Sequence, residues 1–263
     1  MQQQRTLAKY STEDFQKRPI ALRVYDLEEA DVRFAPHSHQ WAQLAYTSQG
    51  VVLVSTEQGR WLVPPGHAVW IPALKVHSIS IGAAAKFMVI HIDPGKTEEM
   101  PKDCGVLSVS PLLRELLASA EHFPQKYEPN TPESRLMAVI LDQMKVAEAA
   151  PLLLPMPVDE RLQKLVAVLM ENPAESRTMT ELAENVGTSA RNLSRLFKSE
   201  TGMTFGKWRQ QRRLMAAIEK LAEGTSVTAV ALDMGYESVS AFISMFRQVL
   251  GVTPSRYFKE VQS

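Results

Sequence analysis

The sequence predicts an α+β protein of two domains, in which a β-barrel or jelly roll precedes an all-α domain. Its 263 residues exceed the length of about 250 at which a single core tends to split. Short β-branched segments fill the chain up to Ile92, whereas helix-starting signals recur after Pro111. The 45% hydrophobic and 22% charged content is typical of a globular protein and excludes collagen-like, coiled-coil and disordered chains.

The first half reads as short strands followed by two helices. We expect strands over 42–46, 51–55, 61–63, 68–71 and 87–92, because these apolar segments are separated by turn residues such as Gly50, Gly59 and Pro72. Strands at this spacing are typical of a barrel or jelly roll. Ser110 and Thr131 each precede a proline, which predicts two capped helices that flank the barrel.

A proline-rich segment marks the predicted domain boundary. Residues 151–157 read PLLLPMP, and their three prolines favour a stiff, extended linker. The predicted domains are therefore 1–150 and 158–263. In the second domain, cap residues and helix-breaking Gly and Pro predict helices over 159–172, 178–186, 189–200, 204–223, 227–234 and 238–250, and a last one starting at 253–254.

One pattern occurs twice in the second domain. The segment from Leu182 to Thr204 recurs from Val230 to Thr253 at an offset of 48 to 49 residues, with matched turn glycines and phenylalanines. Each copy predicts a short helix, a turn and a helix of about three turns, which is the outline of a helix-turn-helix. A helix over 205–223 would span about 28 Å, comparable with the roughly 34 Å between successive major-groove faces of B-DNA.

Positive charge gathers in the first copy although the chain as a whole is neutral. Between Ser189 and Arg213 seven cations stand against one acid, Glu200, a local net charge of +6. The cations are Arg191, Arg195, Lys198, Lys207, Arg209, Arg212 and Arg213. Such a cluster suits phosphates, while the alternative is a solvated charged face on a helical bundle. Lys207 and Arg209, off the second helix of the copy, would contact phosphate if they contact DNA.

The second helix of each copy has an outward polar face. We expect these faces to form the DNA-binding surface, which consists of Ser189, Arg191, Asn192, Ser194, Arg195 and Lys198 in the first copy and Ser240, Ile243, Ser244 and Arg247 in the second.

About 100 C-terminal residues resemble the AraC/XylS family of bacterial transcription regulators. The resemblance is carried by SARNLSRLFK at 189–198, GMT at 202–204, VALDMGYESVSAF at 230–242 and GVTP at 251–254. It implies a seven-helix unit whose two recognition helices enter the major groove. It assigns base contacts to Arg191, Ser194 and Arg195 in the first copy and to Ser240, Ile243 and Ser244 in the second. Because family members often carry Arg where this chain has Ser244, we predict that the first copy dominates specificity.

Histidines cluster in the first domain. His37, His39 and Gln43 followed by His77 resemble the two cupin motifs, in which three His and one Glu bind a divalent metal; Gln43 replaces the Glu. Strand alternation would put His37 and His39 on one face, and a neighbouring strand would bring in His77.

Two interpretations of this cluster stay open. Three imidazoles with a weaker amide ligand suit Zn, Ni or Fe. Alternatively, the four side chains line a cavity and hydrogen-bond a small effector, so that no cofactor is certain. The other histidines, His67, His91 and His122, are interpreted as ordinary surface or packed residues.

The features together predict a transcription regulator, activator or repressor, rather than an enzyme, and no catalytic residue is assigned. Its partners would be double-stranded promoter DNA, a small-molecule effector bound in domain 1–150, and a second copy paired through the helices between Pro111 and Ala150. Two alternatives remain: a metal-dependent cupin enzyme carrying a DNA-binding domain, and a constitutive regulator whose barrel serves only for dimerisation.

Several absences in the sequence predict where the protein acts. No apolar stretch approaches the roughly 18 residues that a membrane span needs, and no secretory signal opens the chain. The single cysteine, Cys104, forms no internal disulfide. We therefore expect a cytoplasmic bacterial protein that does not contact a membrane.

Overall fold

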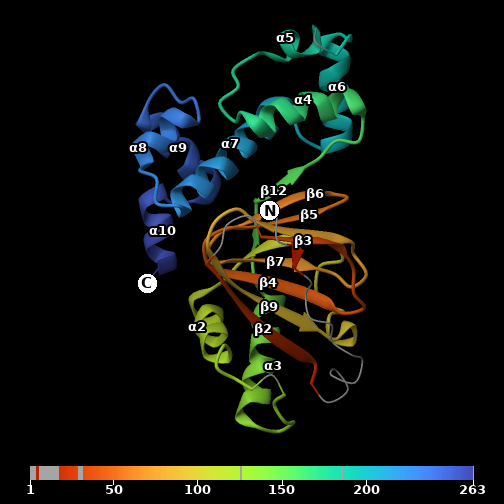
Figure 1. The fold of residues 1–263 in the computed structure, drawn as a ribbon, viewed down its shortest axis with the longest axis vertical. Coiled ribbons are helices and arrows are strands. Elements are labelled where there is room, and N and C mark those ends of the chain that lie inside the picture. The colour runs from red at the N-terminus through yellow and green to blue at the C-terminus, as the bar shows by residue number, and fades with distance from the viewer. Residues whose placement is uncertain (1–3, 6–17, 29–31, 125, 185, 263) are drawn as a thin grey trace. The chain divides into compact units, whose positions relative to one another are not determined.

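The computed structural model describes residues 4–5, 18–28, 32–124, 126–184 and 186–262. The opening residues of the predicted first domain, 1–3 and 6–17, lie outside the described ones. The chain divides into two compact units, one of residues 1–56 and 61–151 and the other of residues 57–60 and 152–263. Strands dominate the first unit and helices the second, as the sequence predicts (Figure 1).

Two six-stranded sheets form a cupin-like sandwich, which confirms the predicted jelly-roll class. The first sheet has the order β1-β3-β8-β5-β6-β12 and the second β11-β10-β7-β4-β9-β2. The strand pairs whose residue register is defined are antiparallel, except that the short β1 is parallel to β3. The strands are β1 (Gln4–Arg5), β2 (Ile20–Leu27), β3 (Val32–His37), β4 (Ala42–Gln49), β5 (Val52–Thr56), β6 (Gly59–Val63), β7 (His67–Ile71), β8 (His77–Ile81), β9 (Ala85–Ile92), β10 (Gly105–Ser108), β11 (Ala149–Ala150) and β12 (Leu153–Pro155).

The five expected strands are present, and the structure adds others that the sequence analysis did not assign. Among them, β2 and β8 lacked an apolar signal because charged or polar residues interrupt them, Arg23 and Asp26 in β2 and two serines in β8. Both strands are completed by hydrogen bonds to neighbours distant in sequence, β9 for β2 and β3 for β8. Tertiary pairing here overrides weak local propensity.

One hydrophobic core of the first unit lies between the second sheet and two helices, α2 (Pro111–Ala120) and α3 (Pro132–Lys145) (Figure 1). The predicted caps are confirmed, since the hydroxyls of Ser110 and Thr131 accept hydrogen bonds from backbone N–H groups. Because side chains alternate along a strand, Leu44 and Ile90 face these helices, whereas Gln43 and His91 face the interior of the sandwich.

Seven helices make up the described part of the second unit, as the resemblance implied. They are α4 (Glu160–Glu171), α5 (Met179–Glu184), α6 (Ala190–Thr201), α7 (Phe205–Ala222), α8 (Val227–Asp233), α9 (Val239–Leu250) and α10 (Pro254–Gln262). The capping box predicted at Thr178 and Glu181 is present, with the Glu181 carboxylate accepting from the Thr178 backbone N–H. None of the helices in the described ranges combines the length and apolar character needed to cross a bilayer.

The proline-rich segment is extended, as predicted, and residues 152–157 of it belong to the second unit. Leu154 is buried within β12, and Trp208 Nε1 donates a hydrogen bond of 2.7 Å to the Pro155 carbonyl. A Cβ added to Gly59 would lie 2.7 Å from the Leu154 carbonyl oxygen, so only glycine allows this approach. The prolines set the extended backbone, and the alternating leucines give it a face to bury.

Candidate functional site

The two copies of the sequence repeat fold alike. Ser189 caps α6 and Ser238 caps α9, each through a hydroxyl that accepts from the backbone N–H three residues later. Gly202 and Gly251 end these helices with φ of 69° and 79°, in the left-handed region that favours glycine. The repeat therefore places two helices of 12 residues between equivalent caps.

An aromatic contact also repeats, which the sequence analysis missed. The ring centroids of Phe197 and Trp208 lie 5.8 Å apart at 88°, and those of Phe246 and Tyr257 lie 5.6 Å apart at 83°. All four side chains are buried. Both pairs are separated by 11 residues in the sequence, and this common spacing was the available signal. The contact holds each recognition helix against the helix that follows it.

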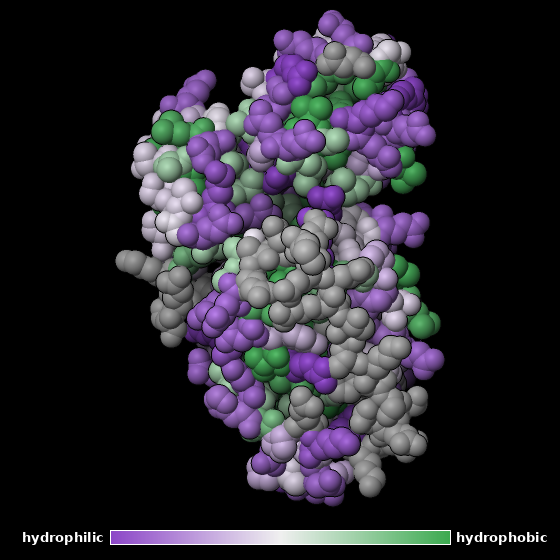
Figure 2. Space-filling view, viewed as in Figure 1, coloured by the Kyte–Doolittle hydropathy of each residue, from purple (hydrophilic) through white to green (hydrophobic). Residues whose placement is uncertain are grey.

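The outward face of α6 is cationic. Arg191, Ser194, Arg195 and Lys198 are exposed, whereas Leu193 is completely buried. Hydrophilic residues cover much of the visible surface of the helical unit (Figure 2). Exposed guanidinium groups at the start and middle of a recognition helix suit phosphate oxygens and guanine edges.

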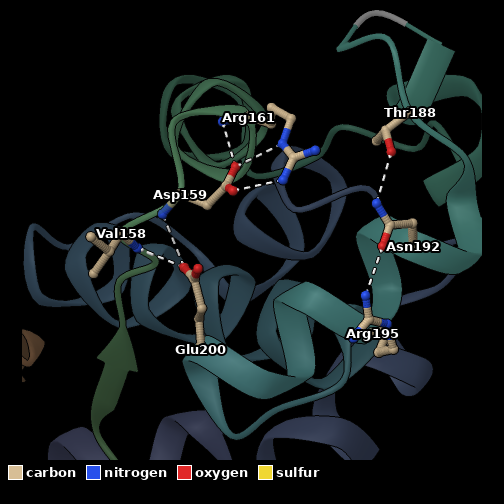
Figure 3. A network of polar contacts seen from close by, with 7 residues as sticks. All are labelled: Val158, Asp159, Arg161, Thr188, Asn192, Arg195 and Glu200. Atoms are coloured by element: carbon tan, nitrogen blue, oxygen red, sulfur yellow. Dashed lines mark hydrogen bonds and ion pairs between the residues drawn. The ribbon is translucent and has the colours of Figure 1, made fainter.

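A polar network orients part of this face (Figure 3). Arg195 Nη2 donates to Asn192 Oδ1 at 3.0 Å, and Asn192 Nδ2 donates to the Thr188 hydroxyl at 3.1 Å. Ser189 already serves as the helix cap. Within the predicted surface, Ser189 and Asn192 thus have structural partners inside the protein, and Asn192 holds Arg195 in one orientation.

The single acid of the basic segment is also structural. Glu200, near the end of α6, accepts hydrogen bonds from the backbone N–H groups of Val158 at 2.8 Å and Asp159 at 3.0 Å (Figure 3). These groups precede α4, so the carboxylate satisfies backbone donors at that helix start. A local pair between Asp159 and Arg161 lowers the pKa of the Asp159 carboxyl to about 2, chiefly through the side-chain hydrogen bond.

Three of the seven cations point into the unit. Arg209 donates to the Arg177 carbonyl and Arg212 to the Met170 carbonyl. Arg213 donates to the carbonyls of three successive residues, 173 to 175, over 3.0 to 3.3 Å. These side chains satisfy backbone carbonyls at and beyond the end of α4. Of the seven cations, three therefore bind backbone carbonyls inside the unit, whereas those on α6 form an exposed cationic surface.

The corresponding face of α9 carries little charge. Ser240, Ser244 and Arg247 are exposed, and Ile243 is half-buried. The apolar side of the helix, with Phe242 and Phe246, is buried. The two recognition helices therefore share a fold but differ in the chemistry they present.

In the first unit, His37, His39 and His77 come together. Their ligand atoms lie within 4.8 Å of one another, and the ring centroids of His37 and His77 are 4.4 Å apart. β3 ends at His37, which pairs with His77 of β8, and His39 lies in the turn just beyond. The predicted cluster is thus present, but His39 joins it from a turn rather than from the same strand.

Each of the three imidazoles is oriented by the protein backbone. The Nδ1 atoms lie 2.7 Å from the Ala35 carbonyl for His37, 2.6 Å from the Trp41 carbonyl for His39 and 3.0 Å from the Lys75 carbonyl for His77. Since a carbonyl only accepts, Nδ1 carries a proton, and in its neutral form each ring presents the lone pair of Nε2. Among the described residues, the buried Nε2 atoms of His37 and His77 have no hydrogen-bond partner.

Gln43 lies beside this group. Its Oε1 is 2.8 Å from His39 Nε2, while its buried Nε2 has no partner in the described part of the chain. Two acceptors cannot bond to each other, so the amide either turns its NH₂ toward His39 or faces a cation shared with that histidine.

The sequence analysis missed one member of this neighbourhood, His91. It pairs directly with Gln43 across β4 and β9, and its ring meets that of His39 edge-on at 5.1 Å. Burial, followed by the charges of nearby groups, lowers its pKa to about 3. Burial likewise lowers the pKa of His77 to about 4. No sequence spacing could reveal His91, because the sheet register brings it to the cluster.

The histidine pKa values predict an acid-sensitive barrel. Between pH 6.5 and about 4 the unfolded His77 binds a proton and the folded one does not, so stability falls as the pH drops through this range. For His77 alone the loss is on the order of 3 kcal/mol. In chelator-treated protein, denaturant unfolding should show a shallower pH slope for His77→Asn than for the wild type. His122→Ala, which removes an exposed histidine, should keep the wild-type slope; equal slopes for His77→Asn and wild type would contradict the assignment.

The donor set of the cluster fits a divalent transition metal. Three Nε2 lone pairs converge while the opposite ring nitrogens are fixed by backbone carbonyls, an arrangement typical of metal-binding histidines. His37, His39 and His77 would hold such an ion, with the Gln43 oxygen as a weaker donor.

Comparison with known proteins assigns the chain to a family. A family model described as an AraC-like ligand binding domain matches residues 19–183, and one described as a helix-turn-helix domain matches residues 182–260. The chain belongs to the AraC/XylS family of transcription regulators. The HTH-type transcriptional regulator NimR of Escherichia coli K12 is 36% identical over 223 residues, which cover 84% of this chain and 81% of NimR.

Solved structures resemble this AraC/XylS regulator more remotely. ToxT from Vibrio cholerae O395 is similar over 93% of this chain and 99% of its own, with 12% identity and a TM-score of 0.40. The DNA-binding domain of AdpA, solved with a target DNA, is similar over 38% of this chain and 90% of its own, with 31% identity and a TM-score of 0.36.

Family membership gives both units of this AraC/XylS regulator a function. The strand-rich unit contains most of the ligand-binding match and the helical unit the helix-turn-helix match. The protein is therefore a DNA-binding transcription regulator with a ligand-binding domain, as the sequence analysis predicts, and its relative NimR is a transcriptional regulator.

Proposed function

We propose that this AraC/XylS regulator binds promoter DNA through α6 and α9 and changes its DNA affinity when an effector occupies the histidine cluster. The observation that carries the proposal is the repeated pair of capped helices, each with a buried aromatic side and an exposed polar one. Effector and DNA then alter each other's affinity by the same factor.

The roles of individual residues follow from their positions. Arg191, Ser194, Arg195 and Lys198 on α6 and Ser240, Ser244 and Arg247 on α9 would face DNA, with Ile243 at the margin of its face. Ser189 and Asn192 would position the helix and Arg195. His37, His39, Gln43 and His77 would bind the effector or ion.

A gel-retardation titration tests the DNA part of the proposal. The wild-type protein should bind a fragment from upstream of its own gene in preference to scrambled competitor, with affinity that falls as salt rises. Equal binding of the promoter fragment and the scrambled fragment, with and without each candidate effector, would contradict the proposal.

We propose the domain functions that the sequence analysis predicts. Residues 1–150 bind the effector and a second copy of the chain, residues 151–157 link the two domains, and residues 158–263 bind DNA. A non-enzymatic function is supported by the regulators among the relatives and by Gln43, a neutral amide where cupin motifs place a carboxylate. Since its partner is chromosomal DNA, we place its action in the bacterial cytoplasm.

We further propose a homodimer formed through α2 and α3. These helices pack on the second sheet, yet Leu112 of α2 is 55% exposed and Val139 of α3 is 43% exposed. Apolar side chains left outside on amphipathic helices favour a partner surface. Light scattering after size exclusion should give a dimer for the wild type and a monomer for Leu112→Glu/Val139→Glu. The matched control is Ala118→Glu, which adds the same charge at an exposed position of α2 about 120° around the helix from Leu112 and should stay dimeric; a monomeric wild type would refute the dimer.

A further inference from the structure

We propose that the effector is a small carboxylate-type anion, recognised jointly by a divalent metal held by the three histidines and by Arg23. The inference rests on the proposed function, because it names the ligand class of the same site. The cupin-like motif implies the metal, whereas neither the family models nor NimR assigns a role to Arg23.

The metal part of the inference depends on the arrangement of hydrogen bonds. Each ring donates through Nδ1 to a backbone carbonyl, which leaves three lone pairs within 4.8 Å of one another. The buried Nε2 atoms of His37 and His77 and the Gln43 Nε2 have no hydrogen-bond partner in the described ranges. Buried polar atoms without partners are costly, and a shared cation would satisfy the histidine lone pairs together with the Gln43 oxygen.

The charge of the ligand set points to an anion. The candidate ligands are three neutral imidazoles and one neutral amide, so a divalent ion would keep its full charge. A protein carboxylate would normally reduce that charge, and the position where the cupin motif places one is Gln43. The group that completes the site should therefore bring its own negative charge.

Arg23 adds a second positive group on the same side of the sheet. Ala21 pairs with His91, so Arg23, two residues further along β2, shares the inward face with His91. Its charge acts on His91, and its Nε atom is buried. In the same sheet His91 pairs with Gln43, which places Arg23, His91 and Gln43 across three adjacent strands. A planar guanidinium recognises carboxylates through paired hydrogen bonds.

The first experiment measures metal binding alone. Full-length protein stripped with a chelator is titrated with zinc chloride in a calorimeter. We expect one zinc per chain for the wild type and for His122→Ala, the matched loss of an exposed histidine, and at least a tenfold weaker affinity for His77→Ala. Absence of stoichiometric zinc binding by the wild type would overturn the inference, whereas retained promoter binding would leave the proposed function intact.

The second experiment tests the anion. Cobalt replaces zinc as a spectroscopic probe, and benzoate is compared with benzamide, its neutral counterpart. Benzoate should change the visible cobalt spectrum and benzamide should not. Arg23→Gln should keep the metal but weaken the benzoate response about tenfold or more. Equal responses to both compounds, or an unchanged benzoate response in Arg23→Gln, would overturn the anion assignment.

A gain-of-affinity variant covers the case in which His77→Ala does not fold. Gln43→Glu supplies the missing carboxylate, so zinc affinity should rise about tenfold or more and the benzoate response should shrink. Unchanged zinc affinity in Gln43→Glu would count against the site. The calorimetric and spectral readouts are independent of DNA binding and of each other.

Discussion

Arg195→Ala should lower the affinity of the regulator for a promoter fragment by about 5- to 150-fold, and Ser244→Ala should lower it by less than about threefold. Arg195 is exposed on α6 and held by Asn192, so its guanidinium reaches DNA already oriented. A bidentate Arg contact to guanine contributes about 1–3 kcal/mol of discrimination, whereas serine accepts several bases. Gel-retardation titrations at one fixed salt concentration measure both variants.

The matched control is Arg247→Ala, which removes an exposed arginine from the corresponding face of α9. If Arg247 contacts only phosphate, this change should lower the affinity for the promoter fragment and for the scrambled fragment by the same factor. Equal losses for Arg195→Ala and Ser244→Ala would show that the first copy does not dominate specificity. Asn192→Ala should reproduce part of the Arg195→Ala loss, because it frees the Arg195 side chain.

Arg213→Met should lower the free energy of unfolding by about 2–3 kcal/mol. Arg213 donates to three carbonyls beyond the end of α4, and its guanidinium lies 6.0 Å from the Tyr236 ring centroid in the second copy. Methionine keeps the apolar stem but leaves these carbonyls without their charged donor. Denaturant titration followed by circular dichroism measures the loss.

Lys207→Met provides the contrast from the same basic segment. Lys207 is exposed near the start of α7, so this change should alter stability by less than about 0.5 kcal/mol. It should reduce the slope of log affinity against log salt concentration by about 1, as expected for the loss of one phosphate contact. If Arg213→Met instead reduced the salt dependence of DNA binding and left stability unchanged, the guanidinium would contact DNA rather than the carbonyls of residues 173–175.

The predictability of the helical unit comes from local chemistry. Ser189, Ser238, Gly202 and Gly251 act within one helical turn of their own positions, so their roles as caps and stops can be recognised from spacing alone. The duplicated pattern and the amphipathic stripes are similarly local, and α6 and α9 lie where the pattern predicts them.

The roles of the cations could not be predicted in the same way. Arg195 and Arg213 are the same residue type in the same basic segment. Arg195 is nevertheless exposed on α6, whereas Arg213 binds backbone carbonyls about 40 residues away in the sequence. A long flexible side chain reaches either solvent or a distant backbone group, and only the packing of α4 against α7 decides which.

By itself the sequence determined the two-domain class and the two capped helices of the repeat, because these depend on short-range periodicity, and it predicted the cluster of His37, His39 and His77 from a resemblance in motif spacing. Only the tertiary structure decided that His91 and Arg23 share the inward face of the sandwich near Gln43, and that Leu154 packs as a strand. The physical reason is that strand register joins residues far apart in the chain, and no local pattern encodes which strands become neighbours.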